Sequence, residues 1–261
     1  MKYNKDNPLR VFTSFSGYDS QVLALKRLKE QNPEFCYEVV GWSEIEETAI
    51  QAHNALFPED KDKLFGDITQ IMWGNVPDFD FFFYSPPCTD ISAAGLQKGL
   101  KRDSGTRSSL IWECEKAIKT KRPKYLMMEN VSALVGKKFI RDFESWLSVL
   151  DELGYDSFWQ LLNTKDFGVP HNRLRVFCIS ILRTKDDPSP AFSFPKPFLL
   201  DKRLADVLEQ KVDEKYFLSD EMLARFCEKS LQEDEELNNP NCILNTGDGE
   251  YVDYENILLS E

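Results

Sequence analysis

An almost unbroken apolar run over residues 79–84 constrains the fold more than any other stretch, because it leads through one serine into Pro86-Pro87-Cys88. Only Asp80 interrupts it, so the run predicts a strand buried on both faces, as in a parallel sheet. The prolines cannot donate ladder hydrogen bonds and therefore end the strand. Ligands gather at the carboxyl ends of strands in open α/β sheets, which predicts a functional place for Cys88. A cysteine by itself is more often a buried small hydrophobe, and the rest of the chain decides between the two.

The composition predicts a globular protein without a membrane span. The chain has 261 residues, enough for one large domain or for one domain and part of another. It has neither an apolar stretch long enough to cross a bilayer nor an apolar signal core at its N-terminus. Six cysteines without a C-x-x-C pair and two histidines predict reduced thiols in a cytoplasm, with no disulfide framework and no metal site.

The net charge of −12 bears on nucleic-acid binding. Nucleic-acid binders usually carry a basic face, so this charge argues against strong non-specific DNA binding by this chain alone. It does not exclude a local basic cluster that dominates one site.

The N-terminal segment predicts a ligand site. A strand over 9–15, a turn over 16–20 and a helix over 21–29 follow one another, as at the nucleotide site of a doubly wound fold. A single glycine, Gly17, is much weaker than the G-x-G-x-x-G fingerprint, which argues against a nicotinamide-dependent dehydrogenase.

Acidic residues follow the next predicted strands. A strand over 37–42 closes on Ser43 and Glu44, where such folds hold ribose hydroxyls. Alternatively, Ser43 and Glu46 form a capping box of the helix predicted over 47–57. A third strand is predicted over 63–68, and Asp67 serves either as a turn residue or as an acceptor for an adenine amine.

A small, basic segment over residues 93–106 follows Cys88 closely. With Arg107 just beyond it, it predicts a mobile lid over a phosphate backbone, against the alternative of a solvated loop. Its basic residues are Lys98, Lys101 and Arg102.

The remaining pattern completes an α/β fold. Helices are predicted over 109–121 and 139–153, and strands over 123–128, 155–163 and 176–182. We therefore predict a doubly wound, mostly parallel sheet with helices on both faces, of the Rossmann-like kind.

The amino-acid composition changes after residue 183. Residues 184–197 are rich in proline, which predicts a linker or an arm over the surface. Short helices are predicted over 203–208 and 219–228, an acidic run over 232–236 and a hairpin within 241–261. We expect residues 1–183 to form a catalytic and cofactor-binding domain, and residues 184–261 a proline-rich arm and the start of an incomplete target-recognition region.

Several segments, in this order, resemble motifs of the cytosine-5 DNA methyltransferase family over about residues 9–183. They are Phe15-Ser16-Gly17, Glu44, Gly66-Asp67-Ile68, Pro87-Cys88 with Ser92, Arg107-Ser108-Ser109-Leu110, Glu129-Asn130-Val131 and His171 to Arg175. No single motif is decisive, but their order and their places at strand ends are highly specific.

The resemblance implies methyl transfer from S-adenosylmethionine to C5 of a cytosine flipped out of double-stranded DNA, with S-adenosylhomocysteine as the product. Cys88 would add to C6 of the ring, which makes C5 enamine-like. Glu129 would hold N3 and the exocyclic amine, and Arg175 and Arg173 would hold the O2 side and the carboxylate. The cofactor-binding residues implied are Phe15, Ser16, Gly17, Tyr18, Asp19, Glu44, Ile45, Asp67, Ile68, Ser85 and Pro87.

The sequence also departs from the family pattern. Thr13 stands where the family has an acid, Asp19 and Ser20 where it has glycines, and His171 in place of the glutamine of Q-x-R-x-R. The recognition domain and the last two motifs are not found after Arg183, which predicts a split or truncated enzyme of bacterial or phage type with a second subunit. A tRNA cytosine-5 methyltransferase and a non-enzymatic methyltransferase-like subunit are the alternatives, and a restriction-associated or a regulatory role both fit.

Overall fold

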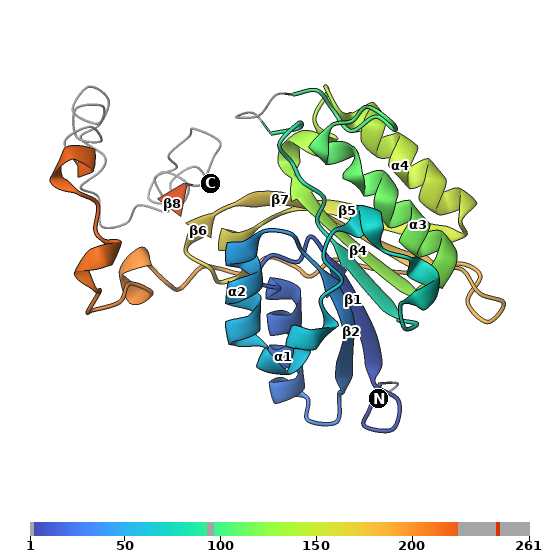
Figure 1. Cartoon of the computed structure of the whole chain (residues 1–261), viewed down its shortest axis with the longest axis horizontal. Coiled ribbons are helices and arrows are strands. Elements are labelled where there is room, and N and C mark those ends of the chain that lie inside the picture. Colours follow the sequence, from blue (N-terminus) through green and yellow to red (C-terminus); the bar gives the residue numbers. More distant parts are fainter. Residues whose placement is uncertain (1–2, 93–96, 224–243, 246–261) are drawn as a thin grey trace. The chain divides into compact units, whose positions relative to one another are not determined.

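The computed structural model describes residues 3–92, 97–223 and 244–245, and a six-stranded sheet forms its centre (Figure 1). The strand order is β2-β1-β3-β4-β7-β5. In chain order the strands are β1 Leu9–Ser14, β2 Tyr37–Ser43, β3 Phe81–Tyr84, β4 Tyr125–Val131, β5 Tyr155–Asn163 and β7 Leu174–Leu182. The predicted α/β class with a mostly parallel sheet is confirmed.

Strand direction decides which residues meet at one edge. The pairs β1–β2, β1–β3 and β3–β4 are parallel, and Ser14 lies level with Ser43 and with Tyr84. Strand β7 runs antiparallel to β4, so that its first residues lie beside the last residues of β4. We call this edge, where β1 to β4 end and β7 begins, the carboxyl edge.

Helices cover both faces of the sheet (Figure 1). On one face Leu25 of α1 packs with Val11 and Phe83. On the other face α3 and α4 contribute to the largest core cluster, which also contains Phe82 and Tyr84. The helices are α1 Ser20–Gln31, α2 Glu47–Leu56, α3 Ile111–Lys121 and α4 Ile140–Glu152.

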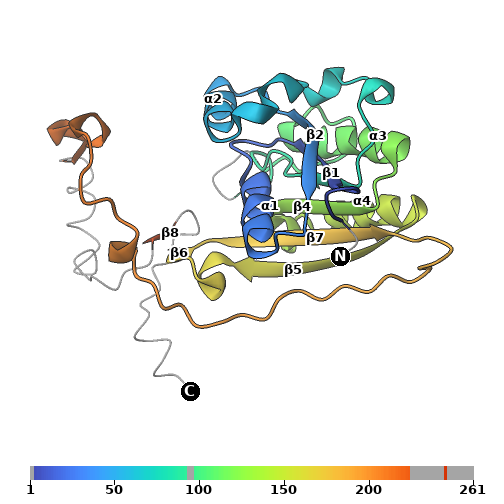
Figure 2. The ribbon, with the colours of Figure 1, turned by 90° about the horizontal axis from the view of Figure 1, so that it is seen from below.

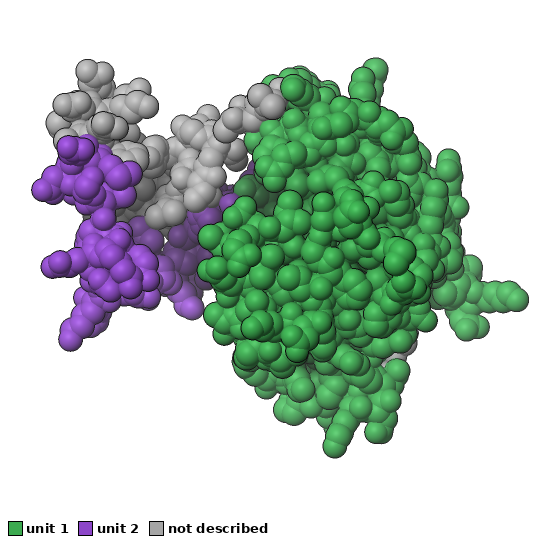
Figure 3. Space-filling view, in the orientation of Figure 1, with its two compact units in different colours: residues 1–161, 175–194 green, residues 162–174, 195–261 purple. Residues whose placement is uncertain are grey.

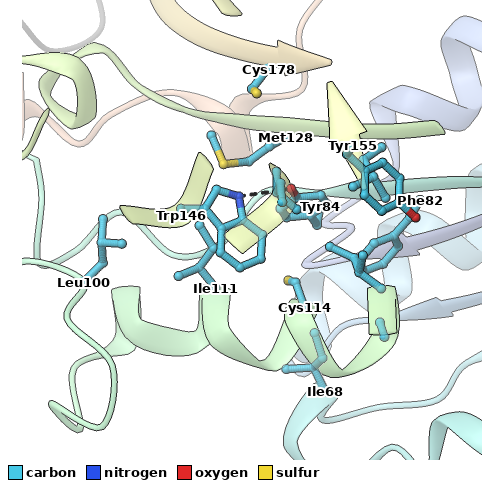
Figure 4. Close-up of a cluster of buried hydrophobic side chains, with 14 of the residues drawn as sticks. Ile68, Phe82, Tyr84, Leu100, Ile111, Cys114, Met128, Trp146, Tyr155 and Cys178 are labelled. Carbon is cyan, nitrogen blue, oxygen red and sulfur yellow. Dashed lines mark hydrogen bonds between the residues drawn. The ribbon is translucent and has the colours of Figure 1, made fainter. Parts of the chain in front are cut away.

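Tyr84 and Trp146 fix the centre of the large core (Figure 4). Trp146 Nε1 donates to Tyr84 Oη at 3.3 Å, and both side chains are fully buried. Burial raises the pKa of Tyr84 well above its ordinary value, so the phenol stays neutral. The paired polar groups let two large aromatic residues fill the space between β3 and α4 without an unsatisfied donor.

Gly41 allows β2 to lie close to β1. The register shifts between Val11 and Phe12, which marks a bulge. A Cβ atom at position 41 would lie 2.6 Å from the Phe12 ring and 2.6 Å from the Phe65 ring. Only glycine fits here without moving these rings.

The predicted third strand over residues 63–68 is wrong. Leu64 forms one isolated bridge with Trp42, and the chain there passes between the short 3-10 helices Pro58–Lys63 and Ile68–Gln70. The Asp67 side chain accepts from Thr69 N at 2.8 Å and so stabilises a turn in place of a strand. The capping box is also wrong, because Ser43 ends β2 and α2 begins at Glu47.

Strands β5 and β7 lie side by side at the other end of the sheet, where the segment after β7 turns back along β5 (Figure 2). Phe192 contacts Phe158 of β5, with ring centroids 6.1 Å apart. The proline-rich segment therefore lies over the surface of the sheet here, as one of the two sequence interpretations predicted.

The chain divides into two compact units, coloured separately in Figure 3. Unit 1 comprises residues 1–161 and 175–194, and unit 2 comprises residues 162–174 and 195–261. Unit 2 holds the two-residue strands β6 His171–Asn172 and β8 Leu244–Asn245 and the 3-10 helices Leu204–Asp206 and Glu214–Tyr216. The domain boundary at residue 183 stays a prediction, and the acidic run over 232–236 and most of the predicted hairpin lie outside the described residues.

Candidate active site

Cys88 lies in a tight turn directly after β3. Its carbonyl accepts the N–H groups of Ile91 at 2.9 Å and Ser92 at 2.8 Å, and its side chain is half-buried. Cys88 therefore lies at the carboxyl edge and is only partly buried, whereas Cys114 and Cys178 are buried in the core.

Two side chains from other elements hold the segment before Cys88. Asn130 Nδ2, from β4, donates to the carbonyl of Pro86 at 3.0 Å. Ser108 Oγ, from the 3-10 helix Arg107–Leu110, donates to the carbonyl of Pro87 at 2.6 Å. Because proline has no N–H group, these carbonyls are the polar groups by which the segment can be fixed.

Ser108 also forms a reciprocal contact with the buried Asp90. The Asp90 N–H donates to Ser108 Oγ at 3.2 Å, and the Ser108 N–H donates to Asp90 Oδ2 at 3.2 Å. Together with the bond to Pro87, this pair encloses the Cys88 turn. The sequence interpretation gave Ser108 and Asp90 no role, although Ser108 lies in one of the family-like segments.

Glu129 and Arg175 form an ion pair at the carboxyl edge. Arg175 Nε lies 3.3 Å from Glu129 Oε1, and the two side chains are 15% and 28% exposed. Glu129 pairs with Phe177 in the ladder, so that Arg175 lies diagonally across from it on the same face of the sheet. Glu129 lies in the last three residues of β4, which ends at Val131, three residues after the end of the strand predicted over 123–128.

Arg173 and His171 belong to unit 2. The Arg173 N–H donates to Asn163 Oδ1 at 3.1 Å, and its carbonyl accepts from Thr164 N at 3.2 Å. These bonds fix the backbone of Arg173 within its own unit. A catalytic contribution from Arg173 stays a prediction.

The segment after β1, residues 15–19, is here called the cofactor loop. Phe15, Gly17 and Asp19 have φ angles of 55°, 57° and 63°, so every second residue is left-handed. Ser16 N donates to the Ser43 carbonyl at 3.2 Å, and Ser85 Oγ donates to the Phe15 carbonyl at 3.2 Å. The loop is thus tied to the ends of β2 and β3.

Backbone donors hold the Glu44 carboxylate from two sides. Oε2 accepts from Gly17 N at 2.8 Å, and Oε1 accepts from Ile45 N at 2.8 Å and Glu46 N at 3.0 Å. A carboxylate has about four acceptor positions, so one is left for a ligand hydroxyl.

Open space and a buried polar atom support a ligand beside Glu44. Apart from each glycine and its chain neighbours, no described residue has a heavy atom within 4 Å of the Cβ position of Gly17 or of Gly66. Ser14 Oγ, at the end of β1, is buried without a hydrogen-bond partner. These residues fit a group that presents ribose hydroxyls to an acid, as S-adenosylmethionine does.

The other residues predicted to bind the cofactor differ in how far they are buried. Tyr18, Ile45 and Asp67 are exposed, and Ser85 and Pro87 are half-buried. Ile68 packs in the large core and Asp19 is fully buried, so their side chains do not face solvent as direct ligand contacts would.

The described part of the predicted lid, residues 97–106, packs against α3. Arg102 forms an ion pair with the buried Glu115 at 2.6 Å and lies 4.2 Å from the centre of the Trp112 ring. Trp112 Nε1 donates to the Leu100 carbonyl at 2.7 Å. Arg102 therefore has a structural partner, whereas Lys98, Lys101 and Arg107 are exposed.

The described residues contain neither a metal-binding group of side chains nor a membrane-spanning helix. Within residues 3–92, 97–223 and 244–245, no group of three or more His, Cys, Asp or Glu side chains is arranged to hold a metal ion. In the same part of the chain, no helix has the length and apolar character of a membrane span.

Comparison with known proteins gives one family. The model of the family described as C-5 cytosine-specific DNA methylase matches residues 9–257. The type II methyltransferase M2.ScrFI of Lactococcus lactis subsp. cremoris is 42% identical, over 83% of this chain and 72% of its own length. M.SsoII of Shigella sonnei and the orphan methyltransferase M.SssI of Spiroplasma monobiae are each 32% identical over 83% of this chain, which spans 54% and 69% of their lengths.

Solved structures show the same fold. A variant of DNMT2 from Spodoptera frugiperda superposes with a TM-score of 0.64 at 23% identity, covering 85% of this chain and 65% of that one. The Dnmt2 methyltransferase of S. pombe has a TM-score of 0.60 at 19% identity, covering 84% and 66%.

Proposed function

The chain belongs to the C-5 cytosine-specific DNA methylase family, and on that premise we propose that it transfers the methyl group of S-adenosylmethionine to C5 of cytosine in double-stranded DNA. The observation that carries the proposal is the Glu129–Arg175 ion pair on β4 and β7, next to the β3 end that leads to Cys88. A nucleophile, an acid and a cation are then contributed by three neighbouring strands at one edge.

Cys88 is the proposed nucleophile. Its sulfur forms a bond to C6 of cytosine, and the electron pair of the 5,6 double bond becomes available at C5. S-adenosylmethionine, when bound, supplies an electrophilic methyl group for C5. Loss of the C5 proton and of the bond to sulfur then restores the double bond and the thiolate. The hydrogen bonds from Asn130 and Ser108 support this role, because they fix the turn that carries the sulfur.

Glu129 is the proposed group that holds N3 and the exocyclic amine of the base. Addition of sulfur to C6 places negative charge on the ring, and a proton shared between the Glu129 carboxyl group and N3 stabilises that charge. The ion pair with Arg175 supports this role, because a paired carboxylate keeps one orientation. A base inside a duplex cannot reach these groups, so the cytosine is flipped out of the stack.

For the cofactor, we propose that Glu44 binds the ribose hydroxyls and that the cofactor loop, with Phe15 and Gly17, lies against the rest of the molecule. Asp67, which is exposed beside Gly66, is the proposed partner of the adenine amine. The support is the free acceptor position of Glu44 and the open space at the two glycines.

Target recognition is proposed to require polypeptide beyond unit 1, supplied by a second subunit or by chain continuous with this one. Two observations support this: M.SsoII is longer than its matched part, and unit 2 exposes large apolar side chains. Among them, Leu199 is 80% exposed, Tyr216 71% and Phe217 66%. We further propose a bacterial or phage cytoplasm as the location and a restriction-associated role, supported by free thiols among the described cysteines and by the type II relatives.

The test is transfer of labelled methyl groups from S-adenosylmethionine to duplex DNA, with tRNA as the parallel acceptor. For the wild-type chain together with a candidate second subunit, we expect label in cytosine of DNA, and we expect none when Cys88→Ala replaces the wild-type chain. Label in tRNA and none in DNA would show that the substrate is RNA, as for a tRNA cytosine-5 methyltransferase. Cofactor binding without transfer to either acceptor, with or without a candidate second subunit, would support a non-enzymatic subunit.

A further inference from the structure

Asp19, the last residue of the cofactor loop, is a buried acid that the proposed reaction does not use. Its Oδ2 accepts a hydrogen bond from Thr13 Oγ1 at 2.7 Å and lies 3.5 Å from His53 Nε2. Thr13 is on β1 and His53 on α2, so one carboxylate joins a strand, a loop and a helix.

The surroundings of Asp19 are apolar and closed. The side chains of Asp19 and His53 are 0% exposed. The His53 ring stacks on Trp42, with centroids 3.6 Å apart and planes 17° apart, and its centroid lies 5.3 Å from that of the Phe57 ring. Among the described residues, Asp19 Oδ1 has no hydrogen-bond partner. A buried carboxylate with an unsatisfied oxygen is costly, which indicates that this arrangement serves more than packing.

The backbone of Asp19 links this cluster to the ligand site. The Asp19 N–H donates to the Ser16 carbonyl at 2.8 Å and closes the turn, while the Asp19 carbonyl accepts from Leu23 N at 3.1 Å. Within the turn, Gly17 N holds Glu44 Oε2 at 2.8 Å. A shift of Asp19 would therefore move the donor that orients the ribose-binding acid.

We propose that Asp19 is a positioning residue for cofactor binding: held by Thr13 and His53, its carboxylate fixes the cofactor loop in the shape that presents Gly17 to Glu44. The left-handed conformation of Asp19 fits this role, because Asp tolerates that region better than most residues. The inference rests on the S-adenosylmethionine site proposed above.

The experiment compares four variants by two measurements. Affinity for S-adenosylhomocysteine is measured by titration calorimetry, and amide hydrogen exchange over residues 15–19 is measured without ligand. Asp19→Gly removes the carboxylate but tolerates the left-handed backbone, and Thr13→Val removes the hydroxyl at nearly constant shape. Asp19→Asn keeps an acceptor for Thr13. Asp60→Asn, at a buried acid paired with Lys63 Nζ at 2.9 Å, is the matched control.

We expect Asp19→Gly and Thr13→Val to bind about tenfold more weakly and to exchange faster over residues 15–19. Asp19→Asn should bind within about twofold of the wild type, and Asp60→Asn should lower stability but leave affinity and loop exchange unchanged. Wild-type affinity and loop exchange in both Asp19→Gly and Thr13→Val would overturn the proposal. If the wild-type chain does not bind the probe, the proposed cofactor site fails, and loop exchange alone decides whether Asp19 fixes the loop.

Discussion

Arg175 Nε contacts Glu129 Oε1 at 3.3 Å across two strands that run in opposite directions. In an all-parallel sheet, a residue at the start of a strand would lie at the edge opposite the strand ends. The reversal of β7 brings the start of that strand to the carboxyl edge, where β4 ends and the Cys88 turn begins. The antiparallel strand is therefore what lets Arg175 reach a site built mainly from parallel strand ends.

Glu129→Gln should lower the rate of methyl transfer by about 10²–10⁴-fold, because an amide cannot transfer a proton to N3 as a carboxyl group can. The change keeps the shape of the side chain, so affinity for S-adenosylhomocysteine should stay within about twofold. Single-turnover transfer of labelled methyl groups measures the effect. Asp151→Asn, which breaks a surface ion pair with Arg183 at 2.8 Å, is the control and should keep the wild-type rate. A Glu129→Gln rate near wild type would contradict the role of Glu129.

Glu44→Gln should weaken binding of S-adenosylhomocysteine by about 10–100-fold, because a charged acceptor of three backbone N–H groups is replaced by a group that donates at one end. Calorimetric titration measures the affinity. Glu46, two residues after Glu44, is exposed, so Glu46→Gln should bind S-adenosylhomocysteine with the wild-type affinity. Equal affinities for the two variants would remove Glu44 from the site.

Ser108→Ala should slow methyl transfer about tenfold and lower the free energy of unfolding by about 1–2 kcal/mol, because the Pro87 carbonyl and the Asp90 N–H lose their partner. Denaturant unfolding and single-turnover kinetics measure the two effects. The control is Ser109→Ala, at the residue next to Ser108. It loses the hydrogen bond that Ser109 Oγ donates to the Thr106 carbonyl at 2.6 Å. It should lose stability but keep the wild-type rate, and a similar loss of rate in both variants would mean that Ser108 has no particular effect on Cys88.

Asp19 should make the wild-type protein less stable, relative to Asp19→Asn, as pH rises. Burial raises the pKa of Asp19 above its ordinary value of 3.8, and contacts with His53 and Thr13 oppose that rise. The folded state therefore binds the proton more tightly than the unfolded state, so stability falls as pH rises from about 4 through the raised pKa. The free energy of unfolding falls by about 1.4 kcal/mol for each pH unit by which the pKa of Asp19 is higher in the folded than in the unfolded protein. Denaturant unfolding of both proteins between pH 4 and 8 measures the difference, and a difference that is constant with pH would contradict the raised pKa.

Much of the fold could be predicted because apolar runs mark buried strands. The run before Cys88 forms β3, and the periodic segment after the first turn forms α1. The segment over 63–68 was predicted wrongly because it is short and because Asp67 bonds its own backbone two residues on, which favours a turn.

The site was predictable in its residue types but not in its contacts. Strand ends identified Cys88 and Glu44, since polar residues follow apolar runs there. The burial of the Asp19 side chain could not be predicted in the same way. The residue lies in a turn, where neither the two-residue period of a strand nor the 3.6-residue period of a helix indicates which side chains face the core. The partners of the Cys88 turn, Ser108 and Asn130, come from distant parts of the chain, and only the register of β3 and β4 brings Asn130 to it.

The proposed methyl transfer depends most on Cys88 as the nucleophile, and covalent trapping tests this role directly. In DNA containing 5-fluorocytosine, C5 carries fluorine and not the proton whose loss releases the enzyme, so a sulfur–C6 bond persists after methyl transfer. Wild-type chain incubated with this duplex, S-adenosylmethionine and a candidate second subunit should gain the mass of one DNA strand, and the linked peptide should contain Cys88. Cys88→Ser should give no adduct. An adduct on another cysteine, or methyl transfer by Cys88→Ser at the wild-type rate, would contradict the account.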